Sequence, residues 1–201
     1  ISGENVIKTK GAIHYLTKKE IDRNRKYIVI EKENKKIISF IIGGPNQYYD
    51  YSEEQINIIF NQIKTLFTPD KYKLIVVPSY RTPENIIKKA FNTFSHNNIV
   101  FKNVDKKAYL SSLSLADVIV VTCDSTSMIS EAAVTGKPIY SANMTPIKNN
   151  SRFRNFYDQF KKLGILRDLE NTVDLWSYNQ LDEANRIAPI IKEKMKLYGI
   201  T

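Results

Sequence analysis

Short, largely apolar runs recur along the chain, and between them apolar residues recur every three or four positions. Such runs are typical of strands buried on both faces of a parallel sheet, and the spaced segments are typical of amphipathic helices. Strands that alternate with helices over most of the chain predict a doubly wound, parallel α/β sheet. The predicted strands lie at residues 37–42, 73–77, 98–101, 117–122 and 139–140.

Polar residues and glycines mark where the predicted helices begin and end. Gly136, with a proline two residues later, predicts the end of one helix. Pro189 predicts a kink in the last helix. Residues 1–36 are polar and mixed, and we expect a short strand, a turn and a linker there. The predicted helix starts are Ser52 in capping-box spacing, Thr82 before Pro83, Ser151 and Asp182.

The segment from Val120 to Pro138 carries the strongest chemical signal, because an apolar strand leads into a hydroxyl-rich turn and then a small-residue helix. Free N–H groups at a helix start, with hydroxyls beside them, suit a phosphate or diphosphate. Glu131 lies one turn into the helix, where a carboxylate could take hydroxyls of a sugar or ribose. A serine-rich cap explains any one serine, but four hydroxyls exceed what one cap needs. The polar residues of this turn are Asp124, Ser125, Thr126, Ser127 and Ser130.

Two further segments follow predicted strands, and the carboxyl ends of parallel strands share the edge where ligands bind. Gly43, Gly44 and Pro45 let a backbone approach a phosphate closely, although paired glycines also simply make turns. Ser79 and Arg81 precede a helix, where the guanidinium could clamp a phosphate, although a surface arginine beside a cap is the simpler explanation.

Other catalytic chemistry finds little support in the sequence. His14 and His96 stand in no metal-ligand spacing, so we expect no metal site. Cys123 follows a buried strand without an obvious base, which favours an inert packed thiol over a nucleophile. No G-x-S-x-G elbow surrounds Asp124, so a hydrolase triad is not indicated. Three tyrosines after the glycine turn could stack on a base or sugar, or wall the cleft; they are Tyr48, Tyr49 and Tyr51.

Composition is that of an ordinary globular protein, with 42% hydrophobic and 25% charged residues. The net charge of +9 is spread along the chain as a lysine-rich surface, without a basic stripe interleaved with aromatics, so we expect no nucleic-acid partner. A single cysteine excludes an internal disulfide and favours a reducing compartment. No apolar run approaches a membrane span and no signal peptide is visible, so we expect a cytoplasmic protein, with peripheral membrane association as an option.

These segments, in this order, resemble the plant mitochondrial-fission "elongated mitochondria" family and its bacterial relatives, described as glycosyltransferases or nucleotide-sugar epimerase-like proteins. The most specific part runs from Asp124 to Pro138. Tyr80 stands where the family pattern suggests an arginine, so only one of the paired arginines is present, and Lys107-Ala108-Tyr109 replaces Asn-Pro-Tyr. The matching segments are 5–14, 42–45, 79–83, 109–117, 122–138, 156 and 164–167.

The resemblance implies the C-terminal half of a GT-B-like fold, in which two Rossmann-like domains face each other across a cleft and the C-terminal one holds the nucleotide sugar. It implies a linker and remnant of the preceding domain at 1–36, a Rossmann-like nucleotide-sugar-binding domain at 37–180, and a C-terminal helix packing back on the domains at 181–201. Acceptor binding, and often the catalytic base, come from the other half, so no catalytic residue is assigned. The implied substrate-binding residues are Gly43, Gly44, Pro45, Ser79, Arg81, Asp124, Ser125, Thr126, Ser127, Ser130 and Glu131.

We therefore expect a GT-B-type glycosyltransferase that takes its glycosyl group from a nucleoside-diphosphate sugar. No metal or other cofactor is expected, because helix starts and Arg81 supply the positive field. The expected partners are the nucleotide sugar and an N-terminal domain of the same protein; the chain begins at Ile1, which suggests a fragment that is inactive alone. The alternatives are an epimerase on the same scaffold, or a non-enzymatic protein that recruits partners as the plant relatives are implicated in doing. The base, the sugar and the acceptor stay open.

Overall fold

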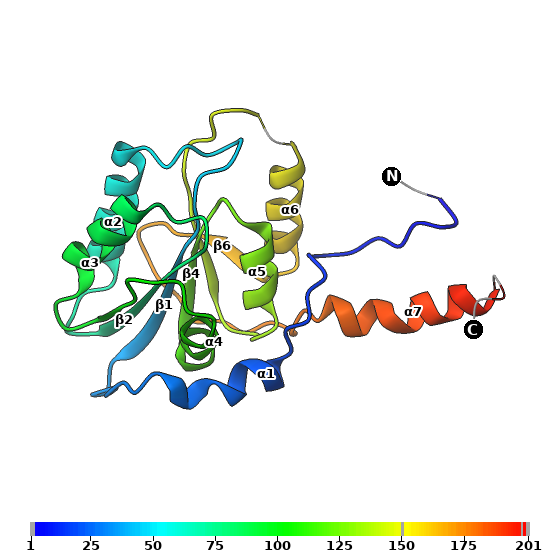
Figure 1. Cartoon of the computed structure of the whole chain (residues 1–201), viewed down its shortest axis with the longest axis horizontal. Helices are drawn as coiled ribbons and strands as arrows, with labels where there is room; N and C mark the ends of the chain where they lie inside the picture. Colours follow the sequence, from blue (N-terminus) through cyan, green and yellow to red (C-terminus); the bar gives the residue numbers. More distant parts are fainter. Residues whose placement is uncertain (1–2, 150, 198, 200–201) are drawn as a thin grey trace.

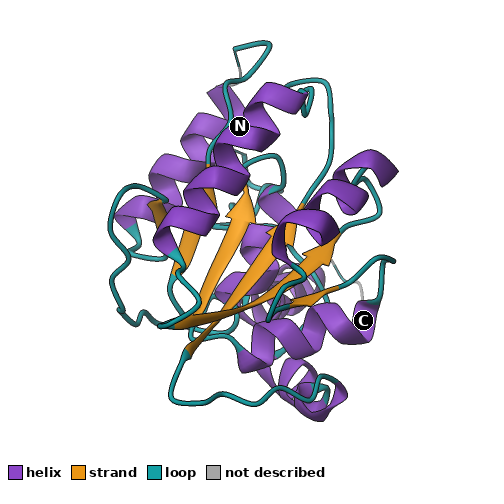
Figure 2. Cartoon of the chain, turned by 90° about the vertical axis from the view of Figure 1, so that its left-hand side faces the viewer, coloured by secondary structure: helices purple, strands orange, loops and turns teal. Residues whose placement is uncertain are grey.

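Six parallel strands form a sheet with helices on both faces in the computed structural model, which describes residues 3–149, 151–197 and 199 (Figures 1 and 2). The strand order is β3-β2-β1-β4-β5-β6, and each neighbouring pair runs parallel. This order confirms the predicted doubly wound, Rossmann-like α/β fold. The strands are β1 (Lys36–Ile42), β2 (Tyr72–Pro78), β3 (Ile99–Val100), β4 (Val118–Thr122), β5 (Ile139–Ala142) and β6 (Leu166–Asp168).

Two of the four predicted start residues cap the helices that follow them. Ser52 Oγ accepts a hydrogen bond from Gln55 N at 3.5 Å, and Asp182 Oδ1 accepts one from Asn185 N at 3.0 Å, so these two caps are confirmed. Gly136, with φ of +72°, follows α5 as the predicted helix-ending glycine. The helices are α1 (Lys18–Arg23), the 3₁₀ helix η1 (Arg25–Tyr27), α2 (Glu53–Leu66), α3 (Glu84–Phe94), α4 (Lys106–Leu115), α5 (Thr126–Ala133), α6 (Ser151–Lys162) and α7 (Glu183–Leu197).

The core lies on both faces of the sheet, because alternate residues of a strand point to opposite sides. On one face, Phe40 of β1 packs edge-on against Phe60 of α2 and Phe94 of α3, with ring centroids 6.1 Å apart in each pair. On the other face, Ile41 of β1 belongs to a buried cluster with Leu110 of α4 and with α5. Burial of each such side chain contributes about 1.5–3 kcal/mol relative to leaving it exposed.

The switch point of the sheet lies between β1 and β4. The chain runs outward from β1 to β2 and β3, and then returns past β1 to form β4. The connections after β1 and β4 therefore leave on opposite faces and open a crevice at the carboxyl ends of these strands, where ligands bind in open parallel sheets. Gly43 follows β1 and Cys123 follows β4, so two of the three predicted segments lie at this crevice.

The strand predicted within residues 1–36 is wrong. The described residues 3–35 hold α1 and η1 and no strand. Thr17 caps α1 by accepting a hydrogen bond from Glu20 N at 3.2 Å, and Ile21 is buried against α4. One buried residue, Ile21, anchors this short helix, and a pattern this sparse carries no clear periodicity in the sequence.

Two predicted helix starts are also wrong. Pro83, rather than Thr82, holds the N-cap position of α3. The Thr82 hydroxyl instead faces the carbonyl oxygens of Ile42 and Gly43, at 2.8 and 2.6 Å, and so ties this loop to the end of β1. Ser151 is the first residue of α6 and not the residue before it. In the first case a tertiary partner outcompetes the local cap, because a buried carbonyl must be hydrogen-bonded.

The last helix, α7, extends away from the sheet beside the N-terminal segment (Figure 1). Lys10 N donates to Glu183 Oε2 at 2.6 Å, and Arg186 Nη2 donates to the carbonyl of Lys8 at 2.9 Å. Ile187 is buried, whereas Leu197 near the helix end is exposed. The three predicted domain ranges, including a C-terminal helix that packs back on the domains, stay predictions.

No helix in the described ranges combines the length and the apolar character needed to cross a bilayer. The predicted peripheral membrane association stays a prediction.

Candidate functional site

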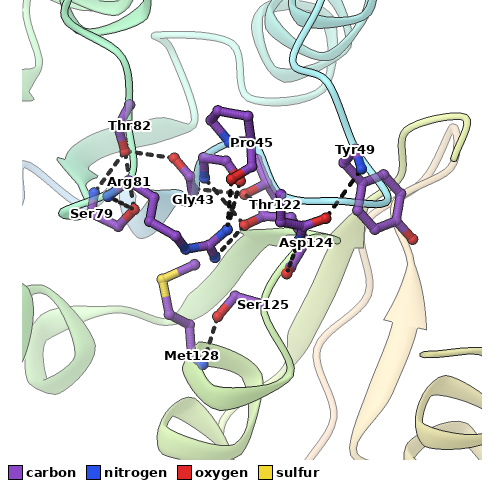
Figure 3. Close-up of polar contacts among 12 residues, drawn as sticks. Gly43, Pro45, Tyr49, Ser79, Arg81, Thr82, Thr122, Asp124, Ser125 and Met128 are labelled. Atoms are coloured by element: carbon purple, nitrogen blue, oxygen red, sulfur yellow. Dashed lines mark hydrogen bonds and ion pairs between the residues drawn. The ribbon is translucent and has the colours of Figure 1, made fainter. Parts of the chain in front are cut away.

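Three loops meet at the carboxyl edge of the sheet, one after β1, one after β2 and one after β4 (Figure 3). Gly43 N donates to Thr122 Oγ1 at 2.8 Å, which joins the first loop to the end of β4. Ser79 N donates to the carbonyl of Ile42 at 2.9 Å, which joins the second loop to the end of β1. The structure therefore brings together the three segments that the sequence marked, because parallel strands deliver their carboxyl ends to one edge.

Asp124 is the polar centre of this edge, and its side chain is completely buried. Its carboxylate accepts hydrogen bonds from Gly44 N at 3.1 Å, Thr122 Oγ1 at 2.7 Å and Arg81 Nη2 at 2.6 Å. The Tyr51 hydroxyl also donates to it. A buried carboxylate with four donors is fully satisfied, so Asp124 holds the three loops to one another.

Arg81 carries the charge that balances Asp124. Its Nη1 donates to the carbonyl of Gly44 at 2.7 Å while its Nη2 bonds the carboxylate, and its side chain is 41% exposed (Figure 3). The guanidinium thus lies at the surface of the crevice with two nitrogens engaged by the protein. The predicted contact between Arg81 and a phosphate stays a prediction. The exposed edge of the guanidinium is the part available for that contact.

Gly43 and Gly44 are glycines because protein atoms occupy the space of a side chain. A Cβ on Gly43 would lie 2.2 Å from Asp124 Oδ1, and a Cβ on Gly44 would lie 1.9 Å from the carbonyl oxygen of Arg81. Both distances are far below van der Waals contact. The close approach that paired glycines permit is therefore made by Asp124 and Arg81, and Pro45 continues the loop above them (Figure 3).

Two of the three tyrosines after the glycine turn belong to the buried core on the α2 face of the sheet. Tyr49 and Tyr51 are buried, and Tyr51 adopts a φ of +59°, a backbone conformation that a bulky side chain rarely takes. Burial and the neighbouring Asp124 carboxylate raise the pKa of Tyr51, so its hydroxyl stays protonated and donates. Tyr48 packs on Phe153, with ring centroids 5.6 Å apart.

Cys123 is a buried thiol, as the sequence suggested. Burial raises its pKa to about 12, so the reactive thiolate is scarce at neutral pH. Its Sγ accepts a hydrogen bond from Met144 N at 3.2 Å. Across the part of the chain that the structure describes, no three His, Cys, Asp or Glu side chains are arranged to hold a metal ion.

The hydroxyls at the start of α5 have different surroundings. Ser125 caps the helix by accepting a hydrogen bond from Met128 N at 3.3 Å (Figure 3). Ser130 donates to the carbonyl of Thr126 at 2.7 Å and accepts from Ala12 N at 3.0 Å, so it fastens the N-terminal segment to α5. Thr126 is half-buried and Ser127 is exposed. The exposed part of this helix start is therefore its first turn.

Beside the first turns of α4 and α5 lies a cavity of about 270 Å³, which we call the Glu131 cavity. On its wall the Tyr109 hydroxyl donates to Glu131 Oε2 at 2.7 Å. Most of the other lining groups are apolar, and Ser79 joins the cavity to the edge of the sheet. The lining residues are Tyr15, Leu16, Ile41, Pro78, Ser79, Tyr80, Val104, Asp105, Lys106, Tyr109, Leu110, Met128 and Glu131.

Most of this wall was not predicted. Tyr15, Lys106 and Tyr109 carried no assigned role, because Tyr15 comes from the N-terminal region and the other two from α4, with no shared motif. Tyr109 lies in a segment that carried the family resemblance, and this was the one signal available in the sequence. Only the packing of α4 against the sheet brings it to Glu131, 22 residues further along the chain.

Fold and site together define a Rossmann-like α/β protein with a candidate ligand cavity at the carboxyl edge of its sheet. The chain belongs to the family described as Mitochondrial fission ELM1, which it matches over residues 1–195. The family predicted from the sequence is thus confirmed.

Two relatives illustrate the match. Protein RP120 of Rickettsia prowazekii (strain Madrid E), which is uncharacterized, is 28% identical over 171 residues, covering 81% of this chain and 48% of that protein. The mitochondrial fission protein ELM1 of Arabidopsis thaliana is 29% identical over 126 residues, covering 60% of this chain and 29% of that protein. The match therefore spans less than half the length of each relative.

Among solved structures, the crystal structure of UDP-GlcNAc 2-epimerase from Neisseria meningitidis bound to UDP-GlcNAc is similar to this chain. The alignment covers 91% of this chain and 42% of that one, with a TM-score of 0.44 and 13% sequence identity.

Proposed function

We propose that this chain is the nucleotide-sugar-binding half of a GT-B-type glycosyltransferase. The observation that supports this most is the wall of the Glu131 cavity, where a carboxylate lies in a largely apolar hollow beside the start of α5. A mostly apolar cavity with a few polar groups is typical of small-molecule sites. A nucleoside would place its base against the apolar wall and its ribose hydroxyls on Glu131.

The start of α5 supports a place for the diphosphate. The half-buried Thr126 and the exposed Ser127 lie in its first turn, and N–H groups there, with the helix dipole, favour an anion. In the transfer, the bond between the anomeric carbon and the diphosphate oxygen breaks and its electron pair leaves with the diphosphate. The negative charge then develops where the helix start stabilises it. The acceptor oxygen forms the new bond and loses its proton to a base that we place outside the residues assigned here.

The acceptor site belongs, on this proposal, to a second domain of the same protein. Support comes from the length of the relatives, since the matched region covers 48% and 29% of them. The crevice would then face that domain, and the nucleotide sugar would lie between the two.

Binding is tested by thermal unfolding of the protein with uridine, guanosine, cytidine and adenosine diphosphate sugars. A ligand at about one hundred times its Kd should stabilise the fold by about 2.7 kcal/mol. Glu131→Ala should reduce that stabilisation. Glu54→Ala is the matched control, because Glu54 is an exposed carboxylate on α2, away from the cavity. Absence of any response across the four nucleotides would contradict the proposal.

Analysis of the products by NMR separates this proposal from its alternatives. A glycosylated acceptor supports transfer, whereas an epimerised free sugar supports an epimerase on the same scaffold. If the intact protein keeps its biological activity after replacement of both Ser127 and Glu131, that result would favour a partner-recruiting protein instead.

A further inference from the structure

Glu131 does not stand alone in its cavity. The Tyr109 hydroxyl, on α4, donates to Glu131 Oε2 at 2.7 Å, so the bond joins two helices across the cavity wall. Burial, and then the Glu131 carboxylate itself, raise the pKa of Tyr109 well above its usual value, so the phenol stays protonated. Within the described residues, Glu131 Oε1 has no hydrogen-bond partner, which leaves one oxygen of the carboxylate for a ligand.

The position of Tyr109 is itself held rigidly. It lies in the first turn of α4, where Asp105 Oδ1 accepts hydrogen bonds from Lys107 N at 2.8 Å and Ala108 N at 3.0 Å. Ala108 is completely buried, so this turn packs directly against the core. A capped turn with Ala108 packed in the core holds the phenol in place, and the phenol then orients the carboxylate.

We infer that Tyr109 is a positioning residue that fixes the Glu131 carboxylate to bind the two adjacent hydroxyls of a ribose, an inference that rests on the proposed function. One hydroxyl donates to Glu131 Oε1. The second donates to a remaining lone pair of Glu131 Oε2 or of the Tyr109 oxygen. That oxygen can accept this bond because its own O–H donates to the carboxylate. The apolar neighbours Leu110 and Met128 line the same cavity and strengthen these bonds by excluding water.

The test measures how strongly the protein prefers ribose over deoxyribose. The probes are uridine, guanosine, cytidine and adenosine diphosphates, each compared with its 2′-deoxy and 3′-deoxy forms by calorimetry. A hydrogen bond to a charged group corresponds to roughly a tenfold or greater difference in Kd. We expect the wild type to prefer at least one ribonucleotide about tenfold or more, and Tyr109→Phe to reduce that preference to about two- to threefold.

Tyr140→Phe is the matched control. The Tyr140 hydroxyl accepts a hydrogen bond from Asp174 N at 2.7 Å, and neither of these residues lines the cavity. This variant should keep the wild-type preference. Equal weakening of ribose and deoxyribose binding by Tyr109→Phe, or no change at all, would overturn the positioning role while leaving the proposed function standing. Failure of all four diphosphates to bind would overturn both.

A second variant keeps the test decisive if Tyr109→Phe does not fold. Glu131→Asp retracts the carboxylate by one methylene and should separate it from the Tyr109 hydroxyl, so it should lose the ribose preference while retaining the charge. Where Tyr109→Phe does fold, the double variant adds a further test. The Tyr109→Phe and Glu131→Asp effects on the ribose preference should be less than additive in it, because both break the same contact. Full additivity, or a Glu131→Asp variant with the wild-type preference, would overturn the inference.

Discussion

Replacing Arg81 by methionine should destabilise the fold, because the buried carboxylate of Asp124 would lose its cation. Loss of one partner from a buried ion pair typically costs about 3–5 kcal/mol. The cost here should be smaller, about 2–3 kcal/mol, since the Arg81 side chain is 41% exposed and three neutral donors stay on the carboxylate. The neutral donors come from Gly44, Thr122 and Tyr51.

Urea unfolding measures this cost. With a slope of about 2 kcal/mol per molar urea, the midpoint should fall by about 1–1.5 M at unchanged slope. Arg23→Met is the matched control, because its ion pair with Glu20 is exposed, and it should change stability by less than about 0.5 kcal/mol. In a double-mutant cycle, Arg81→Met and Asp124→Asn should couple by at least about 1 kcal/mol. A midpoint for Arg81→Met like that of the control, or an additive cycle, would refute the reasoning.

Three further outcomes are expected. Gly44→Ala should lower stability by about 3 kcal/mol or more in thermal unfolding, because its Cβ would meet the backbone of Arg81 at 1.9 Å; wild-type stability would contradict this. Cys123, with a pKa of about 12, should resist iodoacetamide at about pH 8 in the native protein and react after unfolding, and rapid native labelling would contradict its burial. Ser130→Ala should speed proteolysis within residues 3–13, because Ala12 N loses its acceptor, whereas Ser127→Ala at an exposed site should not.

The candidate site was partly visible in the sequence. Gly43, Arg81 and Asp124 were each singled out, and the structure brings them together, because all three follow strands of one parallel sheet. Their contacts could not be predicted, since a glycine that approaches a phosphate and a glycine that approaches a carboxylate leave the same pattern. Tyr109 was missed for a related reason, because its partner lies 22 residues away on another helix.

The N-terminal region and the loop after β2 show why local signals failed. A strand was predicted before residue 37, yet α1 forms there with Ile21 buried against α4. Thr82 has the type and place of a helix cap, yet its hydroxyl serves the end of β1. In both cases a contact with a distant element outweighs a local preference worth about 1 kcal/mol.

The sequence by itself determined the doubly wound parallel sheet, the family and the three segments at its carboxyl edge, because strand burial, helix periodicity and strand-end glycines are local properties of the chain. Only the tertiary structure decided what those segments do to one another. It paired Arg81 with Asp124, and it joined Tyr109 to Glu131 on the wall of a cavity. The physical reason is that charge pairing and cavity shape depend on distances between groups far apart in the chain, which residue order alone does not contain.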